Sequence, residues 1–419
     1  MIQHGNLRKA LLDWMEWFRK FSKELIPRND IPAFPSDLCL ALIGVRRSGK
    51  TSTAVQIGCS LSTIETIFYF NFEDPVFFSG GDVSDIEALI TIYEEEMGTR
   101  PNVVVLDEIH NVVGWERWVR KAVDTGSYKV IVTGSSSKLL SSEIATAISG
   151  RVIEHTIWPL SFKEYVTFKQ KAPSTEGLWL REFENYLRWG GFPKAVLLNE
   201  DEERALLLKQ YLSDIVLRDV VARHTIKNQH GLNQLVTWYL TNLSCLHSYT
   251  AIRKAFGMSI EMISTFSNYL AQAFLAFEMT RYHPNLKVQV RDPKKVYIVD
   301  PGIRTVSLRY DREDWGRLAE NAVYIELRRR GKEIFYYKNE KEVDFILTEL
   351  GKPIQAIQVA YTDLEDAQTK EREISALLEC MGDLKLHKGI ILTRALEHTE
   401  TIRGHQVKYI PLYRWLAQG

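Results

Sequence analysis

Cysteine is sparse in this chain of 419 residues, and long apolar runs and net charge are absent. The four cysteines lie far apart and form no C-x-x-C pair, which fits a reducing cytoplasm rather than a disulfide-bonded secreted protein. No apolar run approaches the roughly 20 residues that a membrane helix needs, and residues 1–20 lack the apolar core of a secretory signal. We therefore expect a cytoplasmic protein that has no membrane partner.

The balance of charge excludes a protein that is attracted to polyanions by its net charge. The chain has 53 Lys and Arg residues and 53 Asp and Glu residues, so it has no overall attraction to nucleic acid or to a membrane. Any surface that binds a polyanion must therefore be local. The length of the chain predicts two to four domains with ample apolar core.

A phosphate-binding motif is the strongest chemical signal that is present. Residues 44–51 read GVRRSGKT and match the P-loop pattern G-x-x-x-x-G-K-[ST] without departure. The motif follows an apolar stretch, residues 38–43, and precedes a stretch that favours a helix. In this context backbone N–H groups and the helix dipole bind phosphate. The sequence therefore predicts that the chain binds ATP or GTP.

Individual residues of the motif have distinct expected roles. Lys50 is placed to reach the β- and γ-phosphates, and the Thr51 hydroxyl is placed to ligate Mg²⁺. The full set of residues expected to bind the nucleotide in this loop is Gly44, Arg47, Ser48, Gly49, Lys50, Thr51 and Ser52.

Two adjacent acids follow the apolar residues 103–106. Asp107 is placed to hold Mg²⁺ through water, and Glu108 is placed to orient and deprotonate the attacking water. A Glu directly after this Asp favours hydrolysis by the enzyme itself over a GTPase switch. We therefore expect an ATPase whose cofactors are ATP and Mg²⁺, with Lys50 and Glu108 as catalytic residues.

Strand-like stretches alternate with helical patterns over the first 160 residues, which predicts an α/β fold with a parallel sheet. After the fourth stretch, Ser135 is placed to sense the γ-phosphate. Arg151 opens the fifth stretch and acts either as an arginine finger toward a neighbouring subunit of a homo-oligomer or in a local ion pair. Apolar residues at helical spacing within residues 1–20 predict an amphipathic helix that packs on this core. The five expected strands are residues 38–43, 67–72, 103–106, 129–133 and 152–158.

Further motifs extend these observations into a family resemblance. Glu73 and Asp74 follow the second expected strand, and PLSFKE, GGFP and DPG stand at residues 159–164, 190–193 and 300–302. In this order the motifs resemble the archaeal and bacterial AAA-type ATPases that lie close to the STAND signalling ATPases and carry a restriction-endonuclease-like C-terminal domain. The resemblance implies a P-loop NTPase of the ASCE/AAA type, in which Pro193 rests against the adenine ring.

The resemblance and the periodic patterns together predict four domains. A P-loop ATPase core with its N-terminal helix is expected over residues 1–160, and a helical lid over 161–230. A winged helix is expected over 231–307, and a restriction-endonuclease-like α/β domain over 308–419.

The expected winged helix has a local excess of basic residues. Residues 249–296 contain seven Lys or Arg against three acids, which favours phosphate contacts with DNA. The wing is expected in the loop that follows residue 282. The alternative is that this segment is an internal scaffold, as winged helices of STAND-type ATPases often are.

The last hundred residues follow the order helix, β-hairpin, strand, helix and strand. This order is similar to the restriction-endonuclease core, in which an acid, an Asp and a Glu-x-Lys pair form the metal site. Glu320 and Asp344 match the first two positions, while Gln358 and Ala360 stand where the family has Glu and Lys. The resemblance therefore implies a weakened metal site of Glu320, Asp344 and Gln358 and poor DNA cleavage.

Two functions follow from these patterns and stay open. The first is an ATPase that couples ATP turnover to the binding or processing of DNA, including branched or free-ended DNA. The second is a STAND-like switch in which the nucleotide state controls contact with a protein partner. In such a switch the nuclease-like domain is a scaffold.

Overall fold

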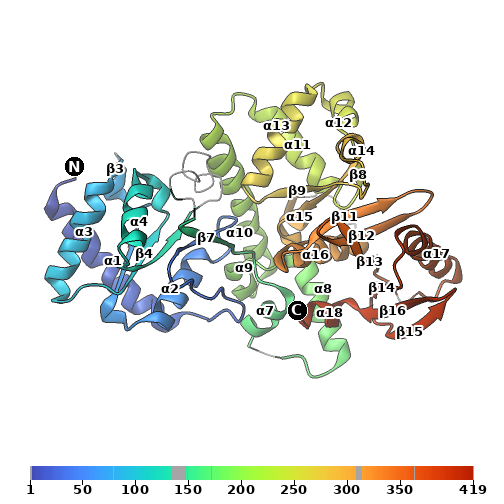
Figure 1. Cartoon of the computed structure of the whole chain (residues 1–419), viewed down its shortest axis with the longest axis horizontal. Helices are drawn as coiled ribbons and strands as arrows, with labels where there is room; N and C mark the ends of the chain where they lie inside the picture. Colours follow the sequence, from blue (N-terminus) through green and yellow to red (C-terminus); the bar gives the residue numbers. More distant parts are fainter. Residues whose placement is uncertain are drawn as a thin grey trace. The chain divides into compact units, whose positions relative to one another are not determined.

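The computed structural model describes residues 2–78, 80–134, 148, 150–170, 172–307, 314–362 and 364–418. The chain divides into two compact units, Met1–Trp158 and Pro159–Gly419 (Figure 1). Each unit is described by itself. Among the described residues, no helix has both the length and the apolar character that crossing a membrane requires.

A five-stranded parallel sheet forms the centre of the first unit, in the order β2-β4-β6-β1-β7. All residues of β1 and β4 are buried, as expected for a parallel sheet that is covered on both faces. The five predicted strands are confirmed, with small shifts at their ends. Their bounds are β1 Cys39–Ile43, β2 Ile67–Asn71, β4 Val103–Asp107, β6 Lys129–Thr133 and β7 Val152–Thr156.

Helices flank this sheet, and the predicted N-terminal helix is one of them. The rings of Trp17 and Phe18 stack on Tyr69 of β2 with centroids 5.1 and 5.6 Å away, so the helix packs on the ATPase core as predicted. The other elements of the unit are short 3₁₀ turns and a two-stranded sheet. The bounds are α1 His4–Glu24, α2 Lys50–Leu61, α3 Val83–Met97, α4 Trp115–Asp124, η1 Ile64–Thr66, η2 Pro75–Phe77, η3 Ile109–Asn111, β3 Gly81–Asp82 and β5 Val112–Val113.

The second unit begins with a run of helices. Ser161 and Glu164 form a reciprocal capping box that starts the first of them. The run ends in a π-helical segment, which continues directly from α10. The bounds are α7 Phe162–Phe168, α8 Glu176–Trp189, α9 Pro193–Leu197, α10 Asp201–Asp214 and η4 Ile215–Ala222.

Two of the matched sequence motifs, GGFP and DPG, meet in this unit. The buried Asp300 carboxylate accepts backbone N–H bonds from Gly191 at 2.6 Å and from Gly302 at 2.9 Å. A Cβ on Gly191 would lie 2.2 Å from the carbonyl oxygen of Leu160. Only glycine at position 191 therefore lets the chain between α8 and α9 approach the backbone of Leu160 this closely.

Residues 229–298 form four helices and a three-stranded antiparallel sheet of order β8-β10-β9. Gly257 has a positive φ of 71° and ends α12, while the Ser259 side chain caps α13, so a short turn separates these two helices. Residues 286–291, expected in an irregular wing, form a short helix instead, because Asn285 caps it. The bounds are α11 Gln229–Thr241, α12 Tyr249–Phe256, α13 Ile260–Gln272, α14 Leu286–Arg291, β8 Leu246–His247, β9 Ala276–Met279 and β10 Lys294–Ile298.

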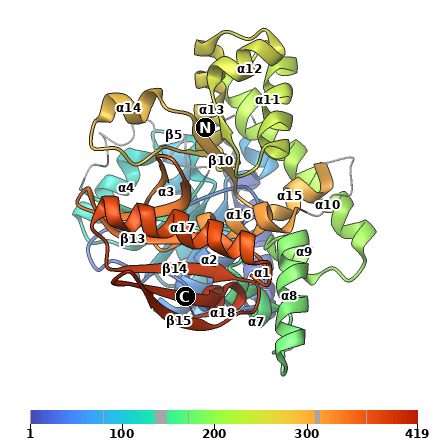
Figure 2. The same ribbon diagram turned by 90° about the vertical axis from the view of Figure 1, so that its right-hand side faces the viewer.

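A six-stranded mixed sheet of order β11-β12-β13-β14-β16-β15 forms the C-terminal part. The parallel strands β13 and β14 are joined through α17, which covers the sheet (Figure 2). Leu377, Cys380 and Met381 of α17 enter the core. The predicted helix, hairpin, strand, helix and strand are all present. The bounds are α15 Pro301–Ser307, α16 Trp315–Arg329, β11 Glu333–Lys338, β12 Glu342–Glu349, β13 Lys352–Ala360, α17 Ala367–Leu384, β14 Lys388–Thr393, β15 His398–Ile402, β16 His405–Pro411 and α18 Leu412–Ala417.

Candidate functional site

The P-loop lies between the end of β1 and the start of α2. Gly44 and Gly49 have φ values of +141° and +101°, a backbone conformation that favours glycine. A Cβ on Gly44 would lie 2.3 Å from the carbonyl oxygen of Ile157. The strand–loop–helix context predicted for this motif is therefore confirmed, and the shape of the loop depends on its glycines.

Polar groups inside the loop fit a phosphate ligand. The Lys50 side chain is buried, and its Nζ donates to the carbonyl oxygens of Gly44 at 3.1 Å and Val45 at 3.2 Å. Ser48 Oγ is buried and has no hydrogen-bond partner among the described residues. An ammonium, a buried hydroxyl and the first turn of α2 supply the donors that phosphate oxygens require. These residues therefore fit the phosphates of a nucleotide.

Asp107 ends β4 and is fully buried. Its Oδ2 accepts hydrogen bonds from Thr51 Oγ1 at 2.8 Å, from Tyr69 OH at 2.9 Å and from Asn71 Nδ2 at 3.2 Å. Its Oδ1 accepts from Thr133 Oγ1. Burial raises the pKa of Asp107, and the hydrogen bonds from the three hydroxyl groups oppose that rise. The structure thus brings together the two residues predicted to hold Mg²⁺, Thr51 and Asp107.

The contacts of three residues with Asp107 were not predicted from the sequence. Tyr69 and Asn71 stand on β2, and Thr133 ends β6. They reach Asp107 because β2 and β6 pair with β4 on either side. For Asn71 and Thr133 the sequence signal was a polar residue at the end of an apolar strand, whereas Tyr69 lies in the middle of β2.

Glu108 follows Asp107 and has a positive φ of 52°, which is uncommon for a residue other than glycine. The side chain of Glu108 is 15% exposed, and its Oε2 lies 3.2 Å from Nδ1 of His110. Burial raises the pKa of Glu108 to about 7, although Lys50 opposes the shift. A carboxylate with this pKa accepts a proton efficiently near neutral pH.

A salt bridge links the P-loop to the end of β2. Arg46 Nη1 lies 3.2 Å from Glu73 Oε1. Next to it, Asp74 accepts from the backbone N–H of Val76 and from Trp14 Nε1, at 2.8 Å in both cases. Glu73 therefore lies beside the nucleotide loop, as expected from its place in the sequence, whereas Asp74 supports the chain around it.

Arg151 forms a local ion pair. Its Nε lies 2.6 Å from Asp124 Oδ1, at the end of α4, and the two side chains are 30% and 45% exposed. This contact corresponds to the second of the two roles considered for Arg151. A role toward a neighbouring subunit remains a prediction.

Four other residues were predicted to contact the nucleotide. Arg47 stands in the loop with a positive φ of 69°, and Ser52 is in the first turn of α2. Ser135 lies outside the described residues. Pro193 is the first residue of α9 in the second unit, and its contact with adenine remains a prediction.

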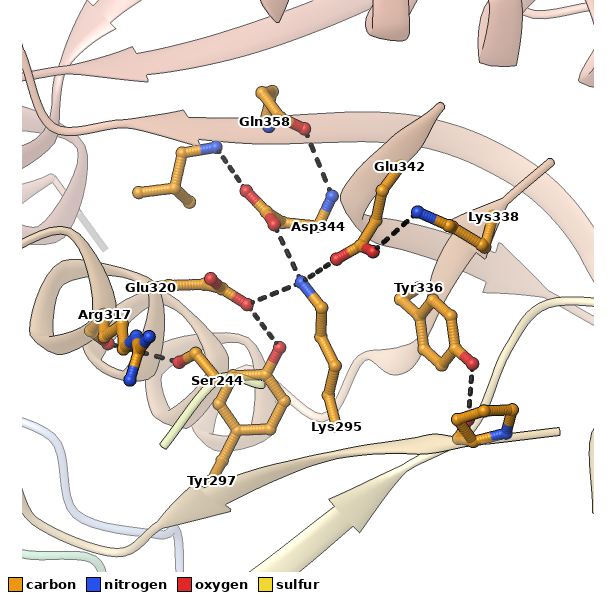
Figure 3. Close-up of polar contacts among 12 residues, drawn as sticks. Ser244, Lys295, Tyr297, Arg317, Glu320, Tyr336, Lys338, Glu342, Asp344 and Gln358 are labelled. Atoms are coloured by element: carbon orange, nitrogen blue, oxygen red, sulfur yellow. Dashed lines mark hydrogen bonds and ion pairs between the residues drawn. The ribbon is translucent and has the colours of Figure 1, made fainter. Parts of the chain in front are cut away.

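In the second unit, Glu320 and Asp344 converge on the ammonium group of Lys295 (Figure 3). Lys295 Nζ lies 3.0 Å from Glu320 Oε1, 2.9 Å from Asp344 Oδ1 and 2.9 Å from Glu342 Oε1. The Lys295 side chain is 2% exposed. Burial opposes its charge, yet the three carboxylates raise the pKa of Lys295 well above its usual value. We call Lys295, Glu320, Glu342 and Asp344 the lysine–carboxylate cluster.

Gln358 does not face this cluster as a metal ligand would. Its Oε1 accepts the backbone N–H of Asp344 at 3.2 Å, and its Nε2 donates to Glu373 at 2.6 Å. Among the described residues, no group of three His, Cys, Asp or Glu side chains is arranged to hold a metal ion. Two of the three residues expected to form the metal site, Glu320 and Asp344, thus contact an ammonium group instead.

Several basic residues of the 249–296 segment are held in ion pairs. Arg281 lies 2.9 Å from Asp292, and Lys294 lies 2.7 Å from Glu278. Tyr239 and Tyr249 also donate to Glu278. With Lys295, three of the seven basic residues counted in the sequence are therefore neutralised internally. The other four are exposed: Arg253, Lys254, Lys287 and Arg291.

Family models match most of the chain. The model described as an AAA domain matches residues 36–166. Two models described as domains of unknown function, DUF8612 and DUF4143, match residues 180–314 and 315–415.

Solved structures that resemble the chain have low TM-scores and low sequence identity. A STAND protein with a tetratricopeptide repeat sensor from Pyrococcus horikoshii has a TM-score of 0.28 and 14% identity, over 73% of this chain and 46% of that chain. The Orc1 protein of Aeropyrum pernix in complex with DNA has a TM-score of 0.30 and 13% identity, over 72% and 95% of the two chains. DnaA from Aquifex aeolicus, bound to AMPPCP, has a TM-score of 0.26 and 16% identity, over 61% and 86%. These scores are too low to bear on function.

Two relatives that align over nearly their whole length show the family of the chain. An uncharacterized protein of Methanocaldococcus jannaschii is 32% identical over 431 residues, covering 97% of this chain and 94% of that protein. An uncharacterized protein of Haemophilus influenzae is 31% identical over 414 residues, covering 95% and 100%. The chain therefore belongs to the family of these two relatives, a family of AAA-type P-loop ATPases.

Proposed function

We propose that the chain binds ATP with Mg²⁺ and hydrolyses it at the carboxyl edge of the sheet in the first unit. The observation that carries this proposal is the contact of Thr51 Oγ1 with Asp107 Oδ2 at 2.8 Å, with the carboxylate of Glu108 on the next residue. Thr51 and Asp107 would hold the metal ion. When bound, Mg²⁺ would neutralise charge on the phosphates.

Other residues of the chain would bind the phosphates, accept a proton from water and hold the two acids in place. The Lys50 ammonium and the backbone of the P-loop bind and orient the phosphates. Glu108 accepts a proton from the attacking water, since burial gives it a pKa of about 7. Thr133 donates to the carboxylate of Asp107 and accepts the backbone N–H of Glu108 at 3.0 Å, so one hydroxyl holds both acids in place.

Phosphate release tests this proposal. The purified chain is incubated with ATP or GTP, in Mg²⁺ or in EDTA. Hydrolysis of ATP that EDTA abolishes supports the proposal, because Thr51 and Asp107 act through a divalent ion. Hydrolysis that is equally fast in EDTA would contradict it.

We further propose that ATP turnover is coupled to DNA binding without DNA cleavage. Support comes from the four exposed basic residues on two helices of the 231–307 segment, Arg253 and Lys254 of α12 and Lys287 and Arg291 of α14. Lys and Arg side chains of this kind bind phosphates irrespective of base sequence. These side chains would therefore contact the phosphates of duplex, single-stranded and branched DNA alike.

DNA stimulation of ATP hydrolysis tests the coupling. Single-stranded, duplex and four-way DNA are compared at increasing salt, using wild type and a variant with all four basic residues changed to Ala. We expect the variant to lose salt-sensitive binding and stimulation but to keep its basal rate. A matched control changes two exposed lysines of the C-terminal sheet, Lys352 and Lys408, to Ala.

A nucleotide-dependent switch that acts on a protein partner is the second candidate. The observation in its favour is that Arg281, Lys294 and Lys295 are committed to internal ion pairs. Neutral net charge points the same way. Absence of any DNA binding at low salt, together with ATP turnover that DNA leaves unchanged, would favour this candidate.

A further inference from the structure

The lysine–carboxylate cluster joins three elements of the second unit. Lys295 comes from β10, Glu320 from α16, and Glu342 and Asp344 from β12. An ammonium group has three N–H donors, and each carboxylate lies 2.9–3.0 Å from Nζ. One lysine therefore satisfies three acids that come from two other elements (Figure 3).

The geometry of the cluster fits an ammonium and not a divalent metal ion. The N–O distances of 2.9–3.0 Å are those of charge-assisted hydrogen bonds. Nζ is within 3.0 Å of both acids that the nuclease pattern assigns to the metal, Glu320 and Asp344. The third expected ligand, Gln358, is turned to Glu373 and to the backbone of Asp344.

A second set of contacts holds β10 against α16. Tyr297 OH donates to Glu320 Oε1 at 2.7 Å, and its ring stacks on Tyr324 with centroids 4.0 Å apart. Asn321 is fully buried, and its side chain accepts from the N–H of Ile298 at 2.8 Å and donates to its C=O at 3.1 Å. The Asn321 amide thus pairs with β10 as a neighbouring strand would.

We propose that Lys295 is a permanent internal cation that takes the place of a metal ion in the C-terminal domain and fastens β10 to α16 and β12. The acids of the nuclease-like pattern then serve as a structural joint. The segment that contains β10 and the C-terminal sheet move as one body, and the C-terminal domain neither requires a metal ion nor cuts DNA. This inference rests on contacts of the second unit alone, so it stands or falls independently of ATP hydrolysis.

Thermal melting of nucleotide-free protein tests the proposal. All melts use the Asp107→Asn background, which removes the metal site proposed at the P-loop, and are recorded in EDTA and in millimolar Mn²⁺ or Mg²⁺. The Asp107→Asn parent, which retains Lys295, is expected to melt at the same temperature with and without metal. Lys295→Met should lower the melting temperature by roughly 10 °C in EDTA, because the buried Asp344 and the partly buried Glu320 and Glu342 lose their cation. Mn²⁺ should restore part of the loss.

Two further variants are controls, one for the loss of a neighbouring lysine and one for a single variant that does not fold. Lys294→Met removes the neighbouring lysine of β10, which is paired with Glu278, and is expected to show no response to metal. Adding Asp344→Asn to Lys295→Met removes one uncompensated charge. The combined variant should melt higher than Lys295→Met alone, and it remains informative if the single variant does not fold.

Three results would overturn the proposal. One is a metal-induced rise in melting temperature of protein that retains Lys295, removed by Asp344→Asn. Another is a Lys295→Met variant as stable as its parent. The third is metal-dependent DNA cleavage by wild-type protein that Asp344→Asn abolishes.

Discussion

Lys294 and Lys295 are consecutive residues of β10, and their ammonium groups contact different carboxylates. Lys294 Nζ lies 2.7 Å from Glu278 Oε2, and Lys295 Nζ lies 2.9 Å from Asp344 Oδ1. Successive side chains of a strand point to opposite faces, so the two lysines serve the two sides of β10. Both cations are therefore committed to internal ion pairs, with side chains 23% and 2% exposed.

Lys50→Ala is expected to weaken ATP binding by at least about 100-fold, because the buried ammonium is the main point charge available to the phosphates. Titration with a fluorescent ATP analogue measures the affinity. Lys23→Ala, at the exposed end of α1, is the control for loss of a lysine elsewhere. Wild-type affinity in Lys50→Ala would remove Lys50 from the site, provided that its melting curve shows a folded protein.

The rate of ATP hydrolysis should rise with pH through about 7. Burial raises the pKa of Glu108 to about 7, and only the deprotonated carboxylate accepts a proton from water. Protonation below this pH therefore removes the base, and deprotonation above it supplies the base. The acidic limb of kcat/KM reports the free enzyme, so its midpoint is the quantity to measure. A flat profile from about pH 6 to 8 would contradict the role of Glu108.

Arg151→Ala and Asp124→Ala are expected to behave alike. Their contact is partly exposed, so each change should have little effect on folding stability and leave ATP turnover unchanged. Denaturant unfolding and phosphate release measure the two effects. A loss of turnover in Arg151→Ala alone, combined with a wild-type rate per subunit that rises with protein concentration, would instead assign an arginine finger to Arg151.

Gly191→Ala is expected to lower the free energy of unfolding by about 1–3 kcal/mol or more, because the added Cβ meets a backbone carbonyl that cannot move aside. That Cβ would lie 2.2 Å from the Leu160 oxygen. Gly177→Ala is the matched control, since a Cβ there meets nothing within 4 Å. In the first turns of α8 this control should be neutral or stabilising by up to about 1 kcal/mol. Equal stability of the two variants would contradict the packing described at Gly191.

The nucleotide site was largely predictable because its chemistry is encoded in contiguous residues. Gly44 to Thr51 are consecutive residues of one loop and the start of α2, and Asp107 and Glu108 stand together at the end of one strand. The hydrogen bonds of Tyr69 and Thr133 to Asp107 were not predictable in the same way. They depend on which strands lie beside β4, and strand order is not local in sequence.

Lys295 shows a different limit of sequence reasoning. Counting it among basic residues favoured a DNA surface, yet it is 2% exposed and paired with acids 25 to 49 residues away. Its place beside the apolar residues Val296 to Val299 was a sign of burial. What could not be foreseen was the cation's partners, since these come together only when β10 packs on α16 and β12.

Single-turnover hydrolysis of bound ATP in wild type and Glu108→Gln tests the assignment of the general base most directly. ATP affinity is titrated on the same preparations, and Glu65→Gln, an exposed glutamate of η1, is the control. We predict that Glu108→Gln binds ATP with Mg²⁺ as wild type does and hydrolyses it about 100-fold more slowly or worse, because the general base is gone. Wild-type turnover in Glu108→Gln would contradict this central claim.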